Sequence, residues 1–212
     1  MPASPDFYYF DLGNVLLSFS HEQGHRQMAA VAGAELSKVV DYFTNDARQL
    51  AYEAGQISTE AMIDGFQQAT GTRPDPSELL LAAGDIFEPI ADSVAILLAM
   101  RAEGRRLGLL SNTCDAHWRV CSDGRYPFLE QTFEQVILSF EHRVAKPDAE
   151  IYRIAARRCG LPPERIFFVD DRPENVRAAC QVGFDAVLFE GPDQLRDDLA
   201  RRGVDSPHLS RG

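Results

Sequence analysis

Four groups of polar residues carry the side chains best suited to do chemistry; three stand at or just after the end of a short apolar run, and the fourth follows a run after a short loop. They are a single carboxylate, a hydroxyl beside an amide, a lysine and a pair of carboxylates. Carboxylates act as nucleophiles and bind hard cations, whereas ammonium, hydroxyl and amide groups hold anions. One such group alone is ordinary turn chemistry, but four together indicate a functional site. In chain order they are Asp11, Ser111-Asn112, Lys146 and Asp170-Asp171.

The apolar runs before these groups predict the elements that position them. From the second run onward, each run is separated from the next by a segment with helical spacing, and such alternation of apolar strands with helices indicates a parallel sheet covered on both faces. We therefore expect an α/β fold with a doubly wound parallel sheet. Ligands bind beyond the carboxyl ends of the strands in such a sheet, so the four groups should meet at one edge. The runs are 7–10, 107–110, 135–138, 166–169 and 186–189.

A long segment between the first two runs breaks this alternation. Roughly ninety residues lie there, far more than a usual crossover, and they show four helical stretches with no convincing strand. Because the insertion begins directly after the first strand, we expect an α-helical cap subdomain over the carboxyl edge of the sheet. The predicted division is 18–89 for the cap, and 1–17 with 90–212 for the core. The helical stretches are 22–32, 36–51, 59–70 and 77–84.

Composition excludes several classes of function. A formal net charge of −11 argues against a nucleic-acid partner, which would require clustered Lys and Arg. The apolar runs are too short to cross a bilayer, and the N-terminus lacks the marks of a signal peptide, so we expect a cytoplasmic protein without a membrane partner. The four cysteines lack metal-finger spacing and are expected to be reduced thiols. A small phosphorylated substrate is compatible with this charge, since a divalent metal and a few cations reverse the sign within a pocket.

In order and spacing, the four groups resemble the motifs of the haloacid dehalogenase (HAD) superfamily, with a helical cap inserted after the first motif. The motifs read FDLGN from Phe10, LSN from Leu110, KP from Lys146 and DDRPEN from Asp170, so the resemblance spans nearly the whole chain. Within the superfamily, the opening FDLGNV and the cap stretch EAGQI from Glu53 are similar to bacterial sugar-phosphate phosphatases of the α-glucose-1-phosphate phosphatase type.

The resemblance implies a phosphatase that hydrolyses a small phosphorylated metabolite, a sugar phosphate, with Mg²⁺ as cofactor. Asp11 would attack phosphorus and carry an aspartyl-phosphate intermediate. Lys146 would neutralise phosphate charge. Ser111 and the backbone N–H of Asn112 would bind phosphate oxygens.

The resemblance also implies a set of metal ligands. Asp11, the backbone carbonyl of Gly13 and one of Asp170 or Asp171 would hold Mg²⁺ together with water. Relatives that carry Gly-Asp in the fourth motif keep only the second acid, so Asp171 is the first choice and Asp170 a second ligand or an outer partner. Asn175 would orient the lysine or a metal-site carboxylate through hydrogen bonds.

One position departs from the usual phosphatase pattern of this superfamily. Most members carry a second aspartate, acting as general acid and then general base, where this chain has Gly13, and the amide of Asn14 cannot titrate in its place. A missing acid costs roughly 10²–10⁴-fold in rate unless it is replaced or unneeded. An anomeric sugar 1-phosphate would need it less because its leaving group is less basic, and water or a cap residue are other proton sources.

Other functions compete with a phosphatase. A haloacid dehalogenase would use Asp11 to attack carbon without a metal, although those relatives usually have a tyrosine at the position of Gly13 and an arginine in the cap. A catalytically silent metabolite-binding scaffold is disfavoured because Asp11 and Lys146 are both present. A cysteine hydrolase built on Cys114 and His117 is unnecessary, since the aspartate system explains the chemistry. The motifs are compatible with a monomer or a homodimer.

Overall fold

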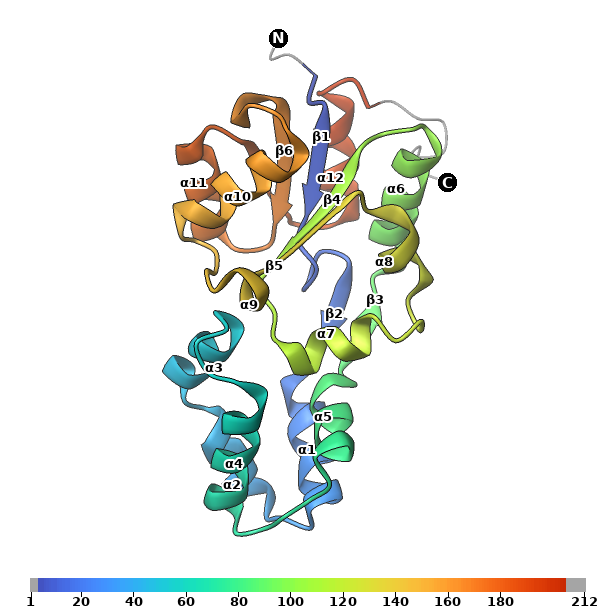
Figure 1. The fold of residues 1–212 in the computed structure, drawn as a ribbon. Helices are drawn as coiled ribbons and strands as arrows, with labels where there is room; N and C mark the ends of the chain where they lie inside the picture. The colour runs from blue at the N-terminus through green and yellow to red at the C-terminus, as the bar shows by residue number, and fades with distance from the viewer. Residues whose placement is uncertain (1–3, 205–212) are drawn as a thin grey trace.

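The computed structural model describes residues 4–204, and a five-stranded parallel sheet lies at its centre (Figure 1). The strand order is β5-β4-β1-β6-β7, and every neighbouring pair is parallel. The chain winds from β1 to one side and then to the other, so the order reverses between β1 and β6. The predicted doubly wound α/β fold is confirmed. The strands are β1 (Phe7–Phe10), β4 (Leu107–Ser111), β5 (Gln135–Leu138), β6 (Ile166–Asp170) and β7 (Asp185–Leu188).

The four aromatic residues of β1 account for its central place. Successive side chains of a strand point to opposite faces, so Phe7 and Tyr9 pack into one apolar cluster and Tyr8 and Phe10 into another. All four are at most 1% exposed. Helices α10 and α11 cover the first face, and α6, α8 and α12 cover the second (Figure 1). These helices are α6 (Ala91–Ala102), α8 (Pro127–Thr132), α10 (Ala149–Cys159), α11 (Pro173–Val182) and α12 (Pro192–Ala200).

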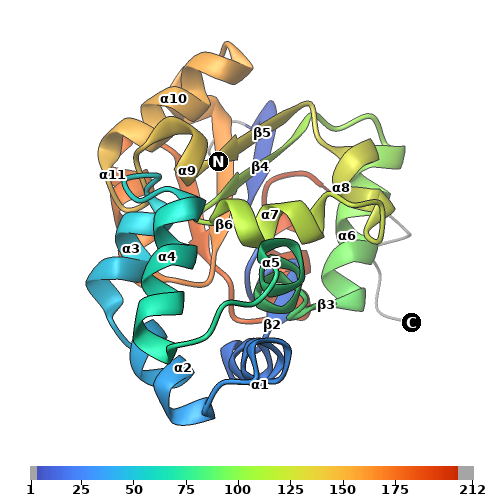
Figure 2. The same ribbon diagram turned by 60° about the horizontal axis from the view of Figure 1, so that its bottom comes forward.

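Five further helices gather beyond the end of the sheet toward which the β1 arrow points, as Figures 1 and 2 show. They bury an apolar cluster of their own, which includes Met28, Tyr42 and Phe66. We call them the cap helices. They contact the core chiefly through α7 (Asp115–Cys121) and α9 (Ser139–His142). The cap helices are α1 (His21–Ala32), α2 (Leu36–Phe43), α3 (Asp46–Glu53), α4 (Thr59–Thr70) and α5 (Pro76–Gly84).

Two features of this region differ from the sequence prediction. The single helix expected over 36–51 is wrong: α2 ends at Phe43, and the side chain of Asn45 caps α3 by accepting a hydrogen bond from the Arg48 backbone N–H at 3.1 Å. The strands β2 (Leu17–Phe19) and β3 (Phe87–Pro89) were not predicted, because three residues carry too little alternation to be recognised. They form an antiparallel ribbon where the chain enters and leaves the cap helices.

The helices of residues 4–204 are too short or too polar for any of them to span a lipid bilayer.

Candidate active site

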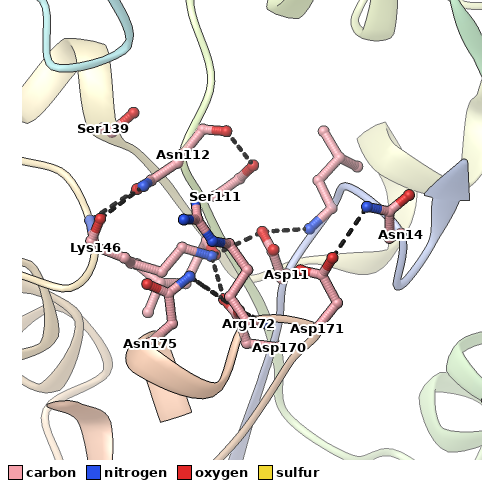
Figure 3. Close-up of polar contacts among 12 residues, drawn as sticks. Asp11, Asn14, Ser111, Asn112, Ser139, Lys146, Asp170, Asp171, Arg172 and Asn175 are labelled. Carbon is pink, nitrogen blue, oxygen red and sulfur yellow. Dashed lines mark hydrogen bonds and ion pairs between the residues drawn. The ribbon is translucent and has the colours of Figure 1, made fainter. Parts of the chain in front are cut away.

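Asp11 directly follows β1, at the edge where the strand order reverses. Its backbone N–H donates to the carbonyl of Val169 at 3.0 Å, which ties it to β6. Its carboxylate Oδ1 accepts from the Leu12 backbone N–H at 2.7 Å and lies 2.8 Å from Lys146 Nζ (Figure 3). The residue is only 7% exposed. A rigid, buried strand end therefore presents one carboxylate in a fixed orientation.

Lys146 is the cation at the centre of the site. Its Nζ contacts Asp11 Oδ1 at 2.8 Å, Asp170 Oδ2 at 2.6 Å and the Leu110 carbonyl at 2.9 Å, so all three ammonium donors are engaged. Its backbone is held by the side chain of Asn112, which donates to the Lys146 carbonyl and accepts from the Lys146 N–H, both at 2.8 Å. The Asn112 amide thus positions the lysine, which sequence reasoning did not foresee.

The two neighbouring aspartates differ in how many partners they have. Asp170 is fully buried; beside its ion pair with Lys146, it accepts from the Arg172 N–H at 2.8 Å and from Asn175 Nδ2 at 2.9 and 3.1 Å. Asp171 is partly exposed, and Asn14 Nδ2 donates to its Oδ2 at 3.0 Å. Asp171 therefore has oxygen lone pairs free for a cation, whereas those of Asp170 are largely occupied.

The charges of this cluster do not balance. Three carboxylates and one ammonium leave two net negative charges when all are ionised. Burial raises the pKa of Asp11 to about 7; Lys146 opposes this rise and Asp170 adds to it. Burial lowers the pKa of Lys146, but the nearby Asp11 and Asp170 outweigh it, so its pKa lies above the usual value and the amine stays charged. Oxygens of Asp11, Asp170 and Asp171 lie within 4.8 Å of one another, a donor set that fits a hard divalent cation such as Mg²⁺.

A cavity of about 60 Å³, the catalytic cavity, adjoins this cluster. The side chain of Ser111, at the end of β4, and Asn112 form part of its wall. Phe19 lies over Gly13, where an added Cβ would come within 2.9 Å of the Phe19 Cε1 atom. The ring thus fills the space that a side chain at position 13 would need. The remaining lining residues are Leu12, His21, Glu53, Phe87, Thr113 and His117.

Two residues of this site were missed from the sequence. Asn14 adopts the left-handed conformation, with φ of 55°, and points its amide at Asp171. Asparagine tolerates this conformation better than most residues, so an Asn in the loop after Asp11 was an available signal. Phe19 gave no such signal, because its place over Gly13 depends on the unpredicted β2–β3 ribbon.

The thiol alternative finds no support in the geometry. Burial raises the pKa of Cys114 to about 12, so the thiol stays protonated at neutral pH. Burial, helped by the neighbouring His21, lowers the pKa of His117 to about 4, which leaves the ring neutral. The two residues therefore do not form an activated thiolate–imidazolium pair.

The fold and the carboxylate–lysine cluster define an α/β enzyme whose site suits an anionic substrate and a cation. Residues 8–183 match the family of haloacid dehalogenase-like hydrolases, and the chain belongs to that family of enzymes.

Individual relatives point to two chemistries. An (S)-2-haloacid dehalogenase of Pseudomonas putida is 31% identical over 111 residues, covering 52% of this chain and 48% of the relative. A glyceraldehyde 3-phosphate phosphatase of Methanothermobacter thermautotrophicus is 29% identical over 125 residues, covering 57% and 54%. The chain spans about half the length of the curated relatives it matches.

Among solved structures, one similar protein is a HAD family enzyme from Bacteroides thetaiotaomicron in complex with magnesium and inorganic phosphate. It is 25% identical, with a TM-score of 0.78 over 98% of this chain and 100% of that chain. A second, a predicted HAD-like hydrolase from Porphyromonas gingivalis, is 24% identical with a TM-score of 0.76 over 96% of this chain and all of the other. At that identity the second similarity concerns the fold alone.

Proposed function

We propose that the chain is a Mg²⁺-dependent phosphatase that hydrolyses a small phosphate monoester through an aspartyl-phosphate on Asp11. The observation that carries the proposal is the convergence of three carboxylates around one fully engaged lysine, because it creates excess negative charge that a divalent cation neutralises. Without a metal, the partly exposed Asp171 would have no cation to balance its charge, since among the described residues its side chain is held only by the neutral amide of Asn14. The complex of the Bacteroides enzyme with magnesium and phosphate supports the same assignment.

In this proposal Asp11, Asp171 and the backbone carbonyl of Gly13 hold the metal. Bound there, Mg²⁺ supplies positive charge beside the phosphate, so that an anionic nucleophile can approach an anionic group. Asp170 acts as an outer partner that fixes Lys146, since its oxygens already accept several hydrogen bonds. Asn175 donates two hydrogen bonds to Asp170, and in this proposal it orients that carboxylate.

The reaction proceeds in two displacements. Asp11 attacks phosphorus through Oδ2, the oxygen that neither Leu12 nor Lys146 engages, and the bond from phosphorus to the leaving oxygen breaks. The leaving oxygen takes up a proton. Water then attacks the aspartyl-phosphate, releasing phosphate and restoring Asp11. Ser111 and the backbone N–H of Asn112 hold phosphate oxygens where charge develops.

The finer assignment, to a sugar phosphate, rests on the sequence resemblance and on relatives named as glyceraldehyde 3-phosphate phosphatases. Sugar phosphates are therefore the reference substrates against which the hydrolysis of other phosphate monoesters should be compared.

A panel of phosphorylated metabolites, with sugar 1-phosphates included, tests the proposal. We expect phosphate release that EDTA abolishes and Mg²⁺ restores. The dehalogenase alternative, favoured by the Pseudomonas relative, is tested in parallel with (S)-2-haloacids. Halide release that survives EDTA, without phosphatase activity, would overturn the assignment.

A further inference from the structure

A second cavity lies among the cap helices, next to the catalytic cavity. This cap cavity has a volume of about 60 Å³, room for roughly four atoms the size of a water molecule. Helices α1, α4 and α5 supply most of its wall, with the start of α7 closing it on the core side; in Figure 2, α1, α5 and α7 lie together and α4 stands opposite them. Its main apolar lining residues are Met28, Phe43, Met62, Phe66, Leu79 and Ile86.

The cap cavity shares part of its wall with the catalytic one, because His21 and His117 line both. Of the described residues that line the cap cavity, none is an aspartate, glutamate, lysine or arginine. Burial lowers the pKa of His117 to about 4 and also lowers the pKa of His25. The boundary between the two cavities thus includes a neutral ring.

Gln49 and Tyr52, two further polar residues of the cap cavity, already have protein partners. Gln49 Nε2 donates to Glu53 Oε1 at 2.9 Å. The Tyr52 hydroxyl accepts from the Ala116 N–H at 3.3 Å and lies 3.1 Å from Thr59 Oγ1. A hydroxyl-rich group placed there would lose its hydration with few partners to replace it, which is costly, whereas an apolar group would gain by leaving water.

We infer that the cap cavity receives an apolar part of the leaving group, so that phosphate monoesters with an alkyl or aryl group are preferred over compact sugar phosphates. This inference rests on the phosphatase activity proposed above, and it replaces the sugar-phosphate assignment with esters that carry an apolar leaving group. The phosphate lies at the sheet edge, and the apolar group passes His21 and His117 to reach the cavity between α1, α4 and α5.

A series of n-alkyl phosphates from methyl to hexyl tests the inference, since the leaving oxygen is an alkoxide throughout and chiefly the apolar length changes. With Mg²⁺ present, kcat/KM should rise about three- to four-fold for each methylene that enters the cavity. The rise should level off once the cavity is full. The kcat/KM for compact sugar phosphates should be lower than that for butyl phosphate.

Ala83→Phe fills the cap cavity, and Ala69→Phe is the matched control on the exposed side of α4. We expect the first variant to flatten the dependence on chain length while methyl phosphate is hydrolysed as before. The control should keep the wild-type slope. Ile63→Trp, which also fills the cavity, replaces Ala83→Phe if that variant does not fold.

Binding of n-alkylphosphonates to the Mg²⁺-loaded protein, measured by calorimetry, separates this inference from the proposed function. Affinity that rises with chain length without hydrolysis of any ester would uphold the cavity and reject the phosphatase. Hydrolysis and binding that are independent of chain length, or a slope unchanged in Ala83→Phe, would overturn the inference and leave the phosphatase standing.

Discussion

The carboxyl edge of the sheet and the cap helices bury opposite kinds of side chain. At the sheet edge, Asp170 and all three donors of Lys146 are held by specific hydrogen bonds and ion pairs. In the cap, Met62 and Phe66 border a mainly apolar cavity, which no aspartate, glutamate, lysine or arginine of the described residues lines. A buried polar network tolerates little change, because any lost partner leaves a desolvated group behind. An apolar cavity changes mainly in volume, so the two regions suit fixed chemistry and variable substrate selection respectively.

The largest expected effect belongs to the nucleophile. Asp11→Asn should lower kcat about 10³-fold or more, because loss of a nucleophile has effects of at least that order in other hydrolases. Steady-state phosphate release with Mg²⁺ measures it, and the circular-dichroism spectrum serves as the folding control. Full activity in this variant would show that Asp11 is not the nucleophile.

Removal of the central cation should lower stability as well as activity. Lys146→Gln leaves Asp11 and Asp170 buried without their partner, which should cost about 3–5 kcal/mol in the free energy of unfolding. Urea denaturation of the metal-free protein measures this. Lys38→Gln is the control in a cap helix: its ion pair with Glu35 is exposed, so about 0–1 kcal/mol is expected. If both variants lose the same free energy of unfolding, the sheet edge is no more sensitive to a lost partner than the cap helices are.

Two buried groups, Asp11 at the sheet edge and His117 in the wall that the two cavities share, should respond oppositely to pH in the metal-free protein. The raised pKa of Asp11 means that the folded state binds more protons than the unfolded state between about pH 4 and 7, so stability is lost as pH rises. The lowered pKa of His117 means that stability is gained as pH rises from about 4 to 6.5. A difference of about three pH units corresponds to about 4 kcal/mol for Asp11, and one of about two and a half units to at most about 3 kcal/mol for His117, which is only partly buried.

Urea denaturation between pH 4 and 8 of two variants separates these contributions. Relative to wild type, Asp11→Asn should become more stable as pH rises, and His117→Gln should become less stable. Parallel curves for wild type and Asp11→Asn would show that the pKa of Asp11 is not raised.

The boundary between the regions can be probed at Gly13. Gly13→Asp introduces a carboxyl group, and Phe19→Leu in the same chain makes room for it. We expect the double variant to hydrolyse alkyl phosphates about 10²-fold faster than Phe19→Leu alone, the low end of what a general acid contributes. Phenyl phosphate, with its less basic leaving group, should change little. If the alkyl esters are hydrolysed no faster, another group of the natural chain already supplies the proton.

The smallest effect is expected at Asn14, which touches Asp171 through one hydrogen bond. Asn14→Ala should weaken Mg²⁺ binding about two- to tenfold, the equivalent of 0.5–1.5 kcal/mol. Calorimetric titration with Mg²⁺ measures this, with Asn45→Ala in the cap as the control. An unchanged affinity for Mg²⁺ would mean that the hydrogen bond from Asn14 does not orient Asp171 for metal binding.

The sheet and the groups at its edge were predictable because parallel strands bring their carboxyl ends together. Asp11, Ser111 and Asp170 needed only the apolar runs before them to be placed on one edge. The cap cavity was not predictable, since helical periodicity shows which side chains are buried but not where five packed helices leave space. The contact of Phe19 with Gly13 was not predictable for a related reason, because it joins a loop to a three-residue strand.

The β2–β3 ribbon has a consequence for how such a chain can be altered. Leu17 pairs directly with Pro89, so the segment between them begins and ends at one place on the molecule. Segments whose ends lie close together can be inserted or removed with little disturbance of the surrounding domain. A short hairpin turn in place of residues 18–88 would leave the parallel sheet's connections intact, and another helical segment could be grafted at the same point. Different sets of cap helices can thus be combined with the same carboxyl edge of the sheet by exchanging a single continuous piece of sequence.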